Sequence, residues 1–138
     1  MNVYLDSSVV LRRLQREALP SADWGRWKHV YSSELLRVEV LRTIDRNRLR
    51  SAITDYEVAE LITSANAIFD GIDWVALTTS VLERAAQSFL TPLGTLDALH
   101  LATALRLVEV RGMDLVFFTH DTELALAARS ANLAVAGA

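Results

Sequence analysis

Residues 114–132, DLVFFTHDTELALAARSAN, hold the pattern that decides the fold. The run 114–119 is short, uninterrupted and rich in β-forming apolar residues, which predicts a buried strand. The run 121–132 follows as a helix and ends at Asn132, a residue that tolerates the left-handed conformation beyond a helix end. A buried strand that leads directly into a helix is the repeating unit of a parallel α/β sheet.

The same alternation continues along the rest of the chain. Thr54 and Thr95 are expected to cap helices, as is Ser32 or Ser33, and Pro92 with Gly94 breaks the chain before one of them. Strands are expected at 2–5, 29–31, 72–77 and 133–137, and helices at 7–17, 32–47, 54–69, 79–89 and 95–107. We predict one domain over 1–138: an α/β fold, arranged as a three-layer α/β/α sandwich around a mostly parallel sheet.

Composition excludes several classes of protein. The 138 residues are 51% apolar and 22% charged, which is typical of a globular domain. The chain has no cysteine, so disulfides and zinc–thiolate sites are excluded. No basic leader or apolar run of membrane-spanning length is evident, so we expect no membrane association and a cytoplasmic location.

The charge distribution is less uniform than the net charge of -3 suggests. Residues 37–50 carry five arginines against Glu39 and Asp45, a local charge of +3. Such a segment is either a solvated helix face with internal ion pairs or a surface that contacts phosphate groups.

A carboxylate interrupts the apolar stripe of the helix predicted from Thr95. At about 100° per residue, Asp97 lies on the same face as Leu101, Ala104 and Val108. His100 is close to that face, and it is either a ligand or base, or a packed structural histidine. Trp24, Trp27 and Trp74 are expected to be packing residues.

Four acids are expected near one edge of the sheet. Each has a local explanation as a cap, a turn residue, a partner of the helix dipole or one half of an ion pair. Together they indicate a shared site, because right-handed crossovers bring the carboxyl ends of parallel strands to one edge. The four are Asp6 after the first strand, Glu39 beside the stripe Leu36–Val40–Ile44, Asp97, and Asp121 after the strand 114–119.

Clustered carboxylates raise one another's pKa and stay ionised together only around a cation. A set of oxygen ligands suits Mg²⁺ or Mn²⁺. The chemistry that such a site serves most often is the displacement of a phosphodiester.

Four sequence blocks resemble the signature motifs of PIN-domain ribonucleases, and in particular the VapC-type toxins of bacterial toxin–antitoxin pairs. In chain order they are VYLDSSVVL, SSELLRVEVLR, LGTLDALHLATAL and VFFTHDTELALAA. The resemblance implies a metal-dependent endoribonuclease with Asp6, Glu39, Asp97 and Asp121 as its acidic residues. It implies that Asp6, Asp97 and Asp121 ligate Mg²⁺ or Mn²⁺, that Glu39 ligates it or positions water, and that Thr119 assists.

The resemblance also implies a homodimer and a cognate antitoxin whose tail lies across the active-site groove. One position departs from the pattern: the family often has a basic residue just before the TLDALH block, where this chain has Gly94. Contacts to RNA phosphate are therefore expected to fall to Arg12 and Arg13 or to arginines of 37–50 such as Arg42 and Arg46.

Two other functions remain possible from the sequence. A phospho-accepting receiver-like domain also gathers aspartates at a sheet edge, but it needs a lysine after a late strand, and the sole lysine is Lys28. The alternative outside enzymes is a PIN-like module that binds RNA or an antitoxin without cleaving RNA.

Overall fold

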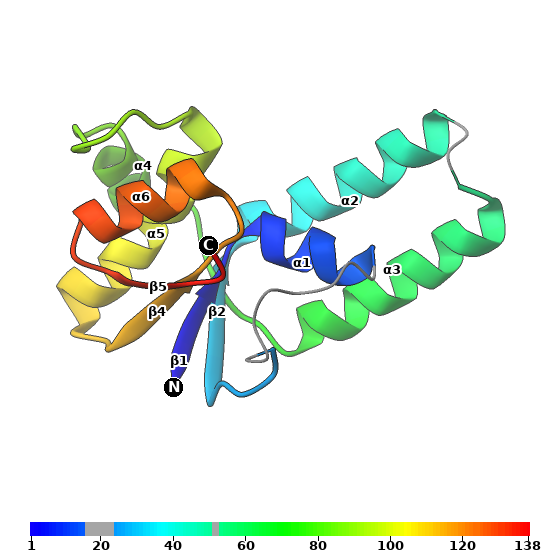
Figure 1. The fold of residues 1–138 in the computed structure, drawn as a ribbon, viewed down its shortest axis with the longest axis horizontal. Helices are drawn as coiled ribbons and strands as arrows, with labels where there is room; N and C mark the ends of the chain where they lie inside the picture. Colours follow the sequence, from blue (N-terminus) through cyan, green and yellow to red (C-terminus); the bar gives the residue numbers. More distant parts are fainter. Residues whose placement is uncertain (16–23, 51–52) are drawn as a thin grey trace.

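The computed structural model describes residues 1–15, 24–50 and 53–138, and within them a parallel sheet has helices on both faces (Figure 1). The strands are β1 (Asn2–Leu5), β2 (His29–Ser33), β3 (Asp73–Val75), β4 (Leu115–Phe118) and β5 (Ala134–Ala136). The helices are α1 (Ser7–Leu14), α2 (Glu34–Leu49), α3 (Asp55–Asp70), α4 (Thr79–Ala85), α5 (Thr95–Arg111) and α6 (Thr122–Ser130).

The sheet has the strand order β3-β2-β1-β4-β5, and all its pairings are parallel. The chain builds β1, β2 and β3 toward one edge, crosses over, and then adds β4 and β5 on the other side of β1. The direction of winding therefore reverses between β1 and β4. In open α/β sheets, ligand sites form at the carboxyl ends of the strands on either side of such a reversal.

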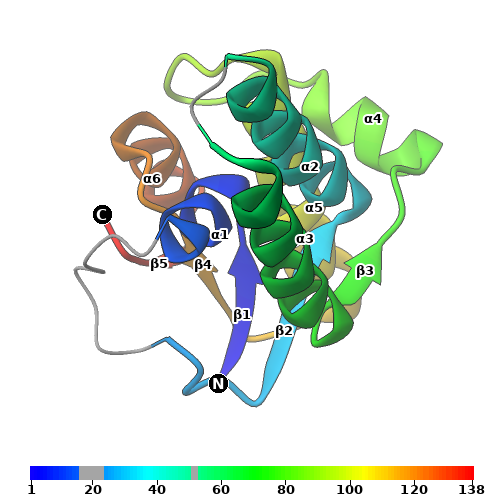
Figure 2. The same cartoon turned by 90° about the vertical axis from the view of Figure 1, so that its right-hand side faces the viewer.

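The two faces of the sheet bury separate apolar clusters. Along β1, Val3 and Leu5 point into the cluster formed with α1, α2 and α3, whereas Tyr4 points into the cluster formed with α5 and α6. Figure 2 shows α1, α2 and α3 together on one side of the sheet and α5 and α6 on the other. This arrangement confirms the predicted three-layer α/β/α sandwich.

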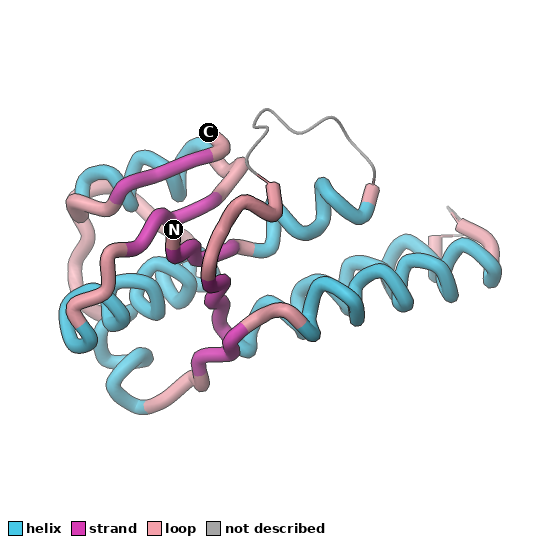
Figure 3. The backbone as a smooth tube through the Cα atoms, turned by 90° about the horizontal axis from the view of Figure 1, so that it is seen from below, coloured by secondary structure: helices cyan, strands magenta, loops and turns pink. Residues whose placement is uncertain are grey.

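Helices α2 and α3 lie side by side and extend well beyond the end of the sheet (Figures 1 and 3). The apolar stripe predicted for α2 is buried, since Leu36, Val40 and Ile44 are at most 5% exposed. In the part of the chain that the structure describes, no helix is long and apolar enough to cross a bilayer.

Several helix ends follow the predicted capping chemistry. Ser33 caps α2 through a hydrogen bond from the Leu35 N–H, and Thr54 caps α3 in a reciprocal capping box with Glu57. Asn132, just beyond α6, has the expected positive φ of 65°.

The prediction that Thr95 caps α5 is wrong. Gly94 is the N-cap, with extended backbone and no side-chain cap, and Thr95 is already the first helical residue. The stretch from Pro92 to Gly94 is therefore entirely non-helical. The helix then runs to Arg111, beyond the predicted end at 107.

Several other predicted elements were too long. The strand expected at 72–77 covers only Asp73–Val75, because Thr78 already caps α4. The helix expected at 79–89 ends at Ala85, and Phe89 packs against the apolar cluster around α5. The helix expected at 7–17 ends at Leu14, and positions 16 and 17 lie outside the described residues.

Two glycines at opposite ends of α5 give a matched test of this geometry. Gly112 has φ of +64° and Gly94 has φ of -70°, and a Cβ at either position would meet open space. We expect Gly112→Ala to lower the free energy of unfolding by about 1 kcal/mol, because an L-residue is strained in the left-handed region. Gly94→Ala should change it by less than about 0.5 kcal/mol. Urea denaturation of both variants checks this, and equal effects would contradict it.

Candidate functional site

The end of β1 and the end of β4 are joined directly at Asp6. The Asp6 N–H donates a hydrogen bond of 3.2 Å to the Phe118 carbonyl. The Asp6 side chain is only 3% exposed, and its Oδ1 accepts from the N–H groups of Ser8 and Val9 at 3.0 and 3.4 Å. Asp6 is therefore the N-cap of α1, and it lies where the winding of the sheet reverses.

Two hydroxyl groups complete the shell around Asp6. Ser8 Oγ donates to Asp6 Oδ1 at 2.5 Å, and Thr119 Oγ1 donates to Asp6 Oδ2 at 2.8 Å. Thr119 Oγ1 also accepts from the Asp121 N–H at 3.0 Å, so it links Asp6 to the loop after β4. Burial raises the pKa of Asp6, and these two hydroxyl groups oppose the rise.

Close packing at Gly137 holds Thr119 in place. Gly137 has φ of +94°, and a Cβ there would lie 2.5 Å from the Thr119 carbonyl oxygen and 2.9 Å from the Phe118 ring. The Thr119 N–H donates to the Ala136 carbonyl at 3.1 Å. The residues at the end of β5 and just after it therefore pack tightly against Phe118 and Thr119, and Thr119 binds Asp6.

Asp121 and Asp97 lie at the first turns of two helices. Asp121 caps α6 by accepting from the Leu124 N–H at 3.0 Å through Oδ1, which leaves Oδ2 without a hydrogen bond from the described residues. Asp97 is half-buried in the first turn of α5, and its carboxylate accepts no hydrogen bond within the described ranges. Both carboxylates therefore retain open oxygens.

Three other acids act on the Asp97 carboxylate. Its pKa is raised to about 6, first by burial and then by the negative charges of Asp121, Asp6 and Glu39, with His100 opposing. The structure therefore places Asp121, Asp6 and Glu39 near enough to Asp97 for their charges to act on it.

The Glu39 carboxylate is hydrogen-bonded to a buried histidine, His100. Its Oε1 lies 2.5 Å from His100 Nε2, and its Oε2 accepts from Ser7 Oγ at 3.3 Å. His100 is 1% exposed, and its Nδ1 lies 2.7 Å from the Tyr4 hydroxyl. His100 is thus a buried, hydrogen-bonded histidine, one of the two alternatives that the sequence left open.

The local explanations proposed for single acids hold in part. Asp6 and Asp121 are helix caps, but the Glu39 carboxylate pairs with neither Arg42 nor Thr43. Arg42 binds Asp45 instead, and the Thr43 hydroxyl bonds the Glu39 carbonyl.

The donor chemistry of the site fits a divalent cation. Asp6, Asp97 and Asp121 present carboxylate oxygens, the ligands that Mg²⁺ and Mn²⁺ prefer, and the raised pKa of Asp97 indicates repulsion that a cation would relieve. Over residues 1–15, 24–50 and 53–138, however, no group of three or more His, Asp or Glu side chains is already arranged to hold a metal ion. In this conformation Asp6 and Asp121 direct Oδ1 toward backbone N–H groups.

The arginines proposed to contact RNA lie on two helices of the site. Arg12 and Arg13 belong to the last turn of α1, the end opposite Asp6, and the Arg13 guanidinium lies 5.3 Å from the centre of the Trp24 ring. On α2, Arg46 is exposed and Arg42 is ion-paired with Asp45 at 3.1 Å.

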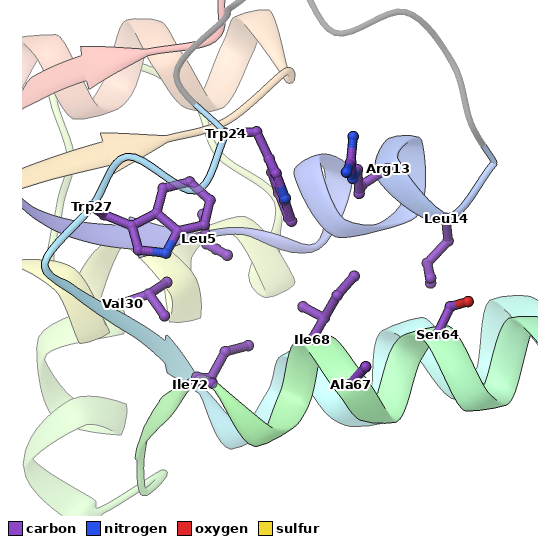
Figure 4. Close-up of a pocket in the computed structure, with 11 residues that line it drawn as sticks. Leu5, Arg13, Leu14, Trp24, Trp27, Val30, Ser64, Ala67, Ile68 and Ile72 are labelled. Atoms are coloured by element: carbon purple, nitrogen blue, oxygen red, sulfur yellow. The ribbon is translucent and has the colours of Figure 1, made fainter.

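A cavity of about 700 Å³ lies between α1, α3 and the segment that precedes β2 (Figure 4). Trp24 and Trp27 form one wall, Ala67 and Ile68 of α3 form another, and Arg13 lies at the edge. None of the four acids lines it. All three tryptophans pack against the apolar cluster on this face, as predicted.

Sequence reasoning missed three residues of the site: Tyr4, Ser7 and Ser8. Ser7 and Ser8 directly follow Asp6 at the start of α1, where hydroxyl side chains commonly bond to a neighbouring cap. That position was a usable signal. Nothing in the sequence indicated a functional role for Tyr4, because a tyrosine in a buried strand is usually a packing residue.

The pKa of Asp97 predicts how stability depends on pH. Its folded-state value of about 6 exceeds the ordinary 3.8, so without metal the stability of the protein falls as pH rises from about 4 to about 6. Asp97→Asn removes this dependence. Above pH 6 the variant should be more stable than the wild type by about 1 kcal/mol, discounted for the partial exposure of the carboxylate.

Urea denaturation in EDTA across this pH range measures the effect. Asp114→Asn is the control, because Asp114 is an exposed aspartate outside the cluster. It should follow the wild-type curve. An Asp97→Asn protein that is less stable than the wild type at neutral pH would contradict the assigned repulsion.

Comparisons with known proteins agree with this architecture. The PIN domain family model matches residues 3–130, and no curated protein sequence matches the chain. The fold resembles VapBC2 from Rickettsia felis, solved bound to a DNA fragment from their promoter, with a TM-score of 0.67, 9% identity, and coverage of 99% of this chain and 98% of that chain. It also resembles VapBC-1 from nontypeable Haemophilus influenzae, with a TM-score of 0.55, 13% identity, and coverage of 99% and 97%. At these identities the likeness concerns the fold. Because the family model covers nearly the whole sequence, the chain belongs to the PIN domain family.

Proposed function

We propose that this protein is a Mg²⁺- or Mn²⁺-dependent endoribonuclease that acts as the VapC-type toxin of a toxin–antitoxin pair. The observation that carries the proposal is that Asp6 and Asp121 follow β1 and β4, the strands on either side of the reversal. Asp97 and Glu39 lie near enough for the pKa of Asp97 to be raised by burial and then by the charges of the other three acids. Membership of the PIN domain family supports a nuclease.

Different residues of the site would bind the cation and orient the water. Asp6, Asp97 and Asp121 would hold the cation through their carboxylate oxygens, and Glu39 would orient the attacking water. When bound, a divalent ion activates water and offsets negative charge on the phosphate. Thr119 and Ser8 would hold Asp6 in place through the hydrogen bonds already formed. The N-termini of α1, α5 and α6 add positive dipole ends beside these acids.

RNA binding requires phosphate contacts that the net charge of -3 does not supply. Arg12, Arg13, Arg42 and Arg46 are proposed to provide them, since they lie on α1, which Asp6 caps, and on α2, which carries Glu39. A single-stranded region of RNA suits the site best, because its backbone can bend toward buried carboxylates.

Cleavage of a single-stranded RNA measures the proposed activity. The wild type with Mg²⁺ or Mn²⁺ should cleave it, and EDTA should stop the reaction. Asp6→Asn and Asp97→Asn should each lower kcat/KM at least about 100-fold, because each removes a charged ligand of the cation. Asp114→Asn, an exposed aspartate away from the cluster, should retain activity.

A thermal scan with Mn²⁺ separates the enzyme from a PIN-like module that binds RNA or an antitoxin without cleaving. The wild type should be stabilised by Mn²⁺ and Asp97→Asn should not. Undiminished cleavage by pure Asp6→Asn protein would disprove the assignment of the site. A wild type that neither cleaves nor responds to Mn²⁺ would favour the binding module.

The protein is further proposed to form a homodimer and to bind a cognate antitoxin. The two solved structures described above are VapBC structures. The cavity between α1 and α3, with Trp24, Trp27 and Ile68 in its lining, is suited to an apolar segment of such a partner, and Arg13 at its edge is suited to an acidic group.

Two neighbouring residues of α3 test the antitoxin surface. Ala67 lines the cavity and Asn66 does not, and both are exposed. Ala67→Glu should weaken binding of the protein encoded by the adjacent reading frame by at least about tenfold, because it brings a charge into an apolar contact. Asn66→Glu should leave binding unchanged. Titration calorimetry measures both, and equal affinities would rule out this surface.

A further inference from the structure

A chain of hydrogen bonds runs from the sheet to Glu39. The Ser33 N–H donates to the Tyr4 hydroxyl at 3.2 Å, the hydroxyl lies 2.7 Å from His100 Nδ1, and His100 Nε2 lies 2.5 Å from Glu39 Oε1. Tyr4 belongs to β1, His100 to α5 and Glu39 to α2. Three elements that are distant in sequence therefore meet in one line of polar contacts.

The partners decide which ring nitrogen of His100 carries hydrogen. An ionised carboxylate only accepts hydrogen bonds, so the contact with Glu39 places a hydrogen on Nε2. In a neutral imidazole Nδ1 is then an acceptor, and the Tyr4 hydroxyl supplies the hydrogen that it needs. The hydroxyl oxygen in turn accepts from the Ser33 N–H. Every donor in this series of hydrogen bonds therefore faces an acceptor.

The burial of these hydrogen-bonded side chains indicates that His100 does more than fill space in the core. Tyr4 is fully buried and His100 is 1% exposed, and the other buried side chains of α5 are apolar except for Thr103. An apolar side chain would fill that position without needing hydrogen-bond partners. The histidine instead brings a hydrogen-bond donor to a carboxylate at the edge of the acid cluster.

The Glu39 carboxylate is held from two sides. His100 binds Oε1, and Ser7, the residue after Asp6, donates to Oε2 at 3.3 Å. His100 also lies three residues after Asp97 on α5. The same two segments that present Asp6 and Asp97 therefore also orient Glu39.

We propose that His100, itself oriented by Tyr4, is a positioning residue that fixes the Glu39 carboxylate for RNA cleavage. This inference rests on the proposed nuclease function. It assigns His100 a role through Glu39, with no contact to substrate or metal.

Substitutions at His100 separate positioning from packing. His100→Leu keeps an apolar bulk and loses the donor, so kcat should fall about 10- to 100-fold while KM for RNA changes less than about twofold. His100→Gln restores a donor near the Nε2 position and should recover most of kcat. Thermal unfolding of each variant checks that it is folded. A His100→Leu enzyme that is folded and fully active would overturn the proposal.

Tyrosine variants test the second link of the chain. Tyr4→Phe removes the hydroxyl that holds Nδ1, and kcat should fall about tenfold. Tyr31→Phe is the matched control: Tyr31 pairs with Tyr4 across β1 and β2, and its hydroxyl is outside this chain. Equal kcat for the two variants would show that Tyr4 does not orient His100.

NMR of ¹⁵N-histidine-labelled, metal-free protein gives a readout that does not depend on cleavage. His100 should show a protonated Nε2 and an unprotonated Nδ1, and Tyr4→Phe should shift the Nδ1 resonance. The opposite tautomer would overturn the proposal.

If the wild type cleaves RNA but His100→Leu does so equally well, only the positioning role fails. If the wild type cleaves no RNA with either metal, the nuclease function fails, and a positioning role in cleavage fails with it.

Discussion

The buried carboxylate of Asp6 is the constraint on which the rest of the site depends. A carboxyl group that is 3% exposed is tolerated only if its oxygens are hydrogen-bonded. The N–H groups of Ser8 and Val9 bind one oxygen and the Thr119 hydroxyl binds the other. These contacts tie the end of β1, the start of α1 and the segment after β4 to one point.

The gathering of four acids is opposed by their mutual repulsion. The pKa of Asp97 is raised first by burial and then by this repulsion, because the charges of Asp121, Asp6 and Glu39 all disfavour its ionised form. Helix N-termini and hydroxyl donors offset part of this cost. The site is therefore stable enough to form, and the proposed cation would relieve the repulsion that remains.

Two polar networks support the acids from opposite faces of the sheet. One joins Asp6 to Ser8 and Thr119, and Gly137 packs against it. The other joins Glu39 to His100 and Tyr4, on the face that α5 covers. Since each network is anchored in a separate apolar cluster, the relative placement of Asp6 and Glu39 depends on how both faces pack against the sheet.

The sequence by itself determined the order of strands and helices, most of the caps, and the four acids expected at one edge of the sheet. These are local patterns of apolar periodicity and of residues that end helices. Three things were decided only by the tertiary structure: the reversal of winding between β1 and β4, the pKa of Asp97, and the partners of His100. The contacts of His100 span 61 and 96 residues, and no local pattern encodes which distant side chains will meet. Such meetings depend on how α2 and α5 pack on opposite faces of one sheet.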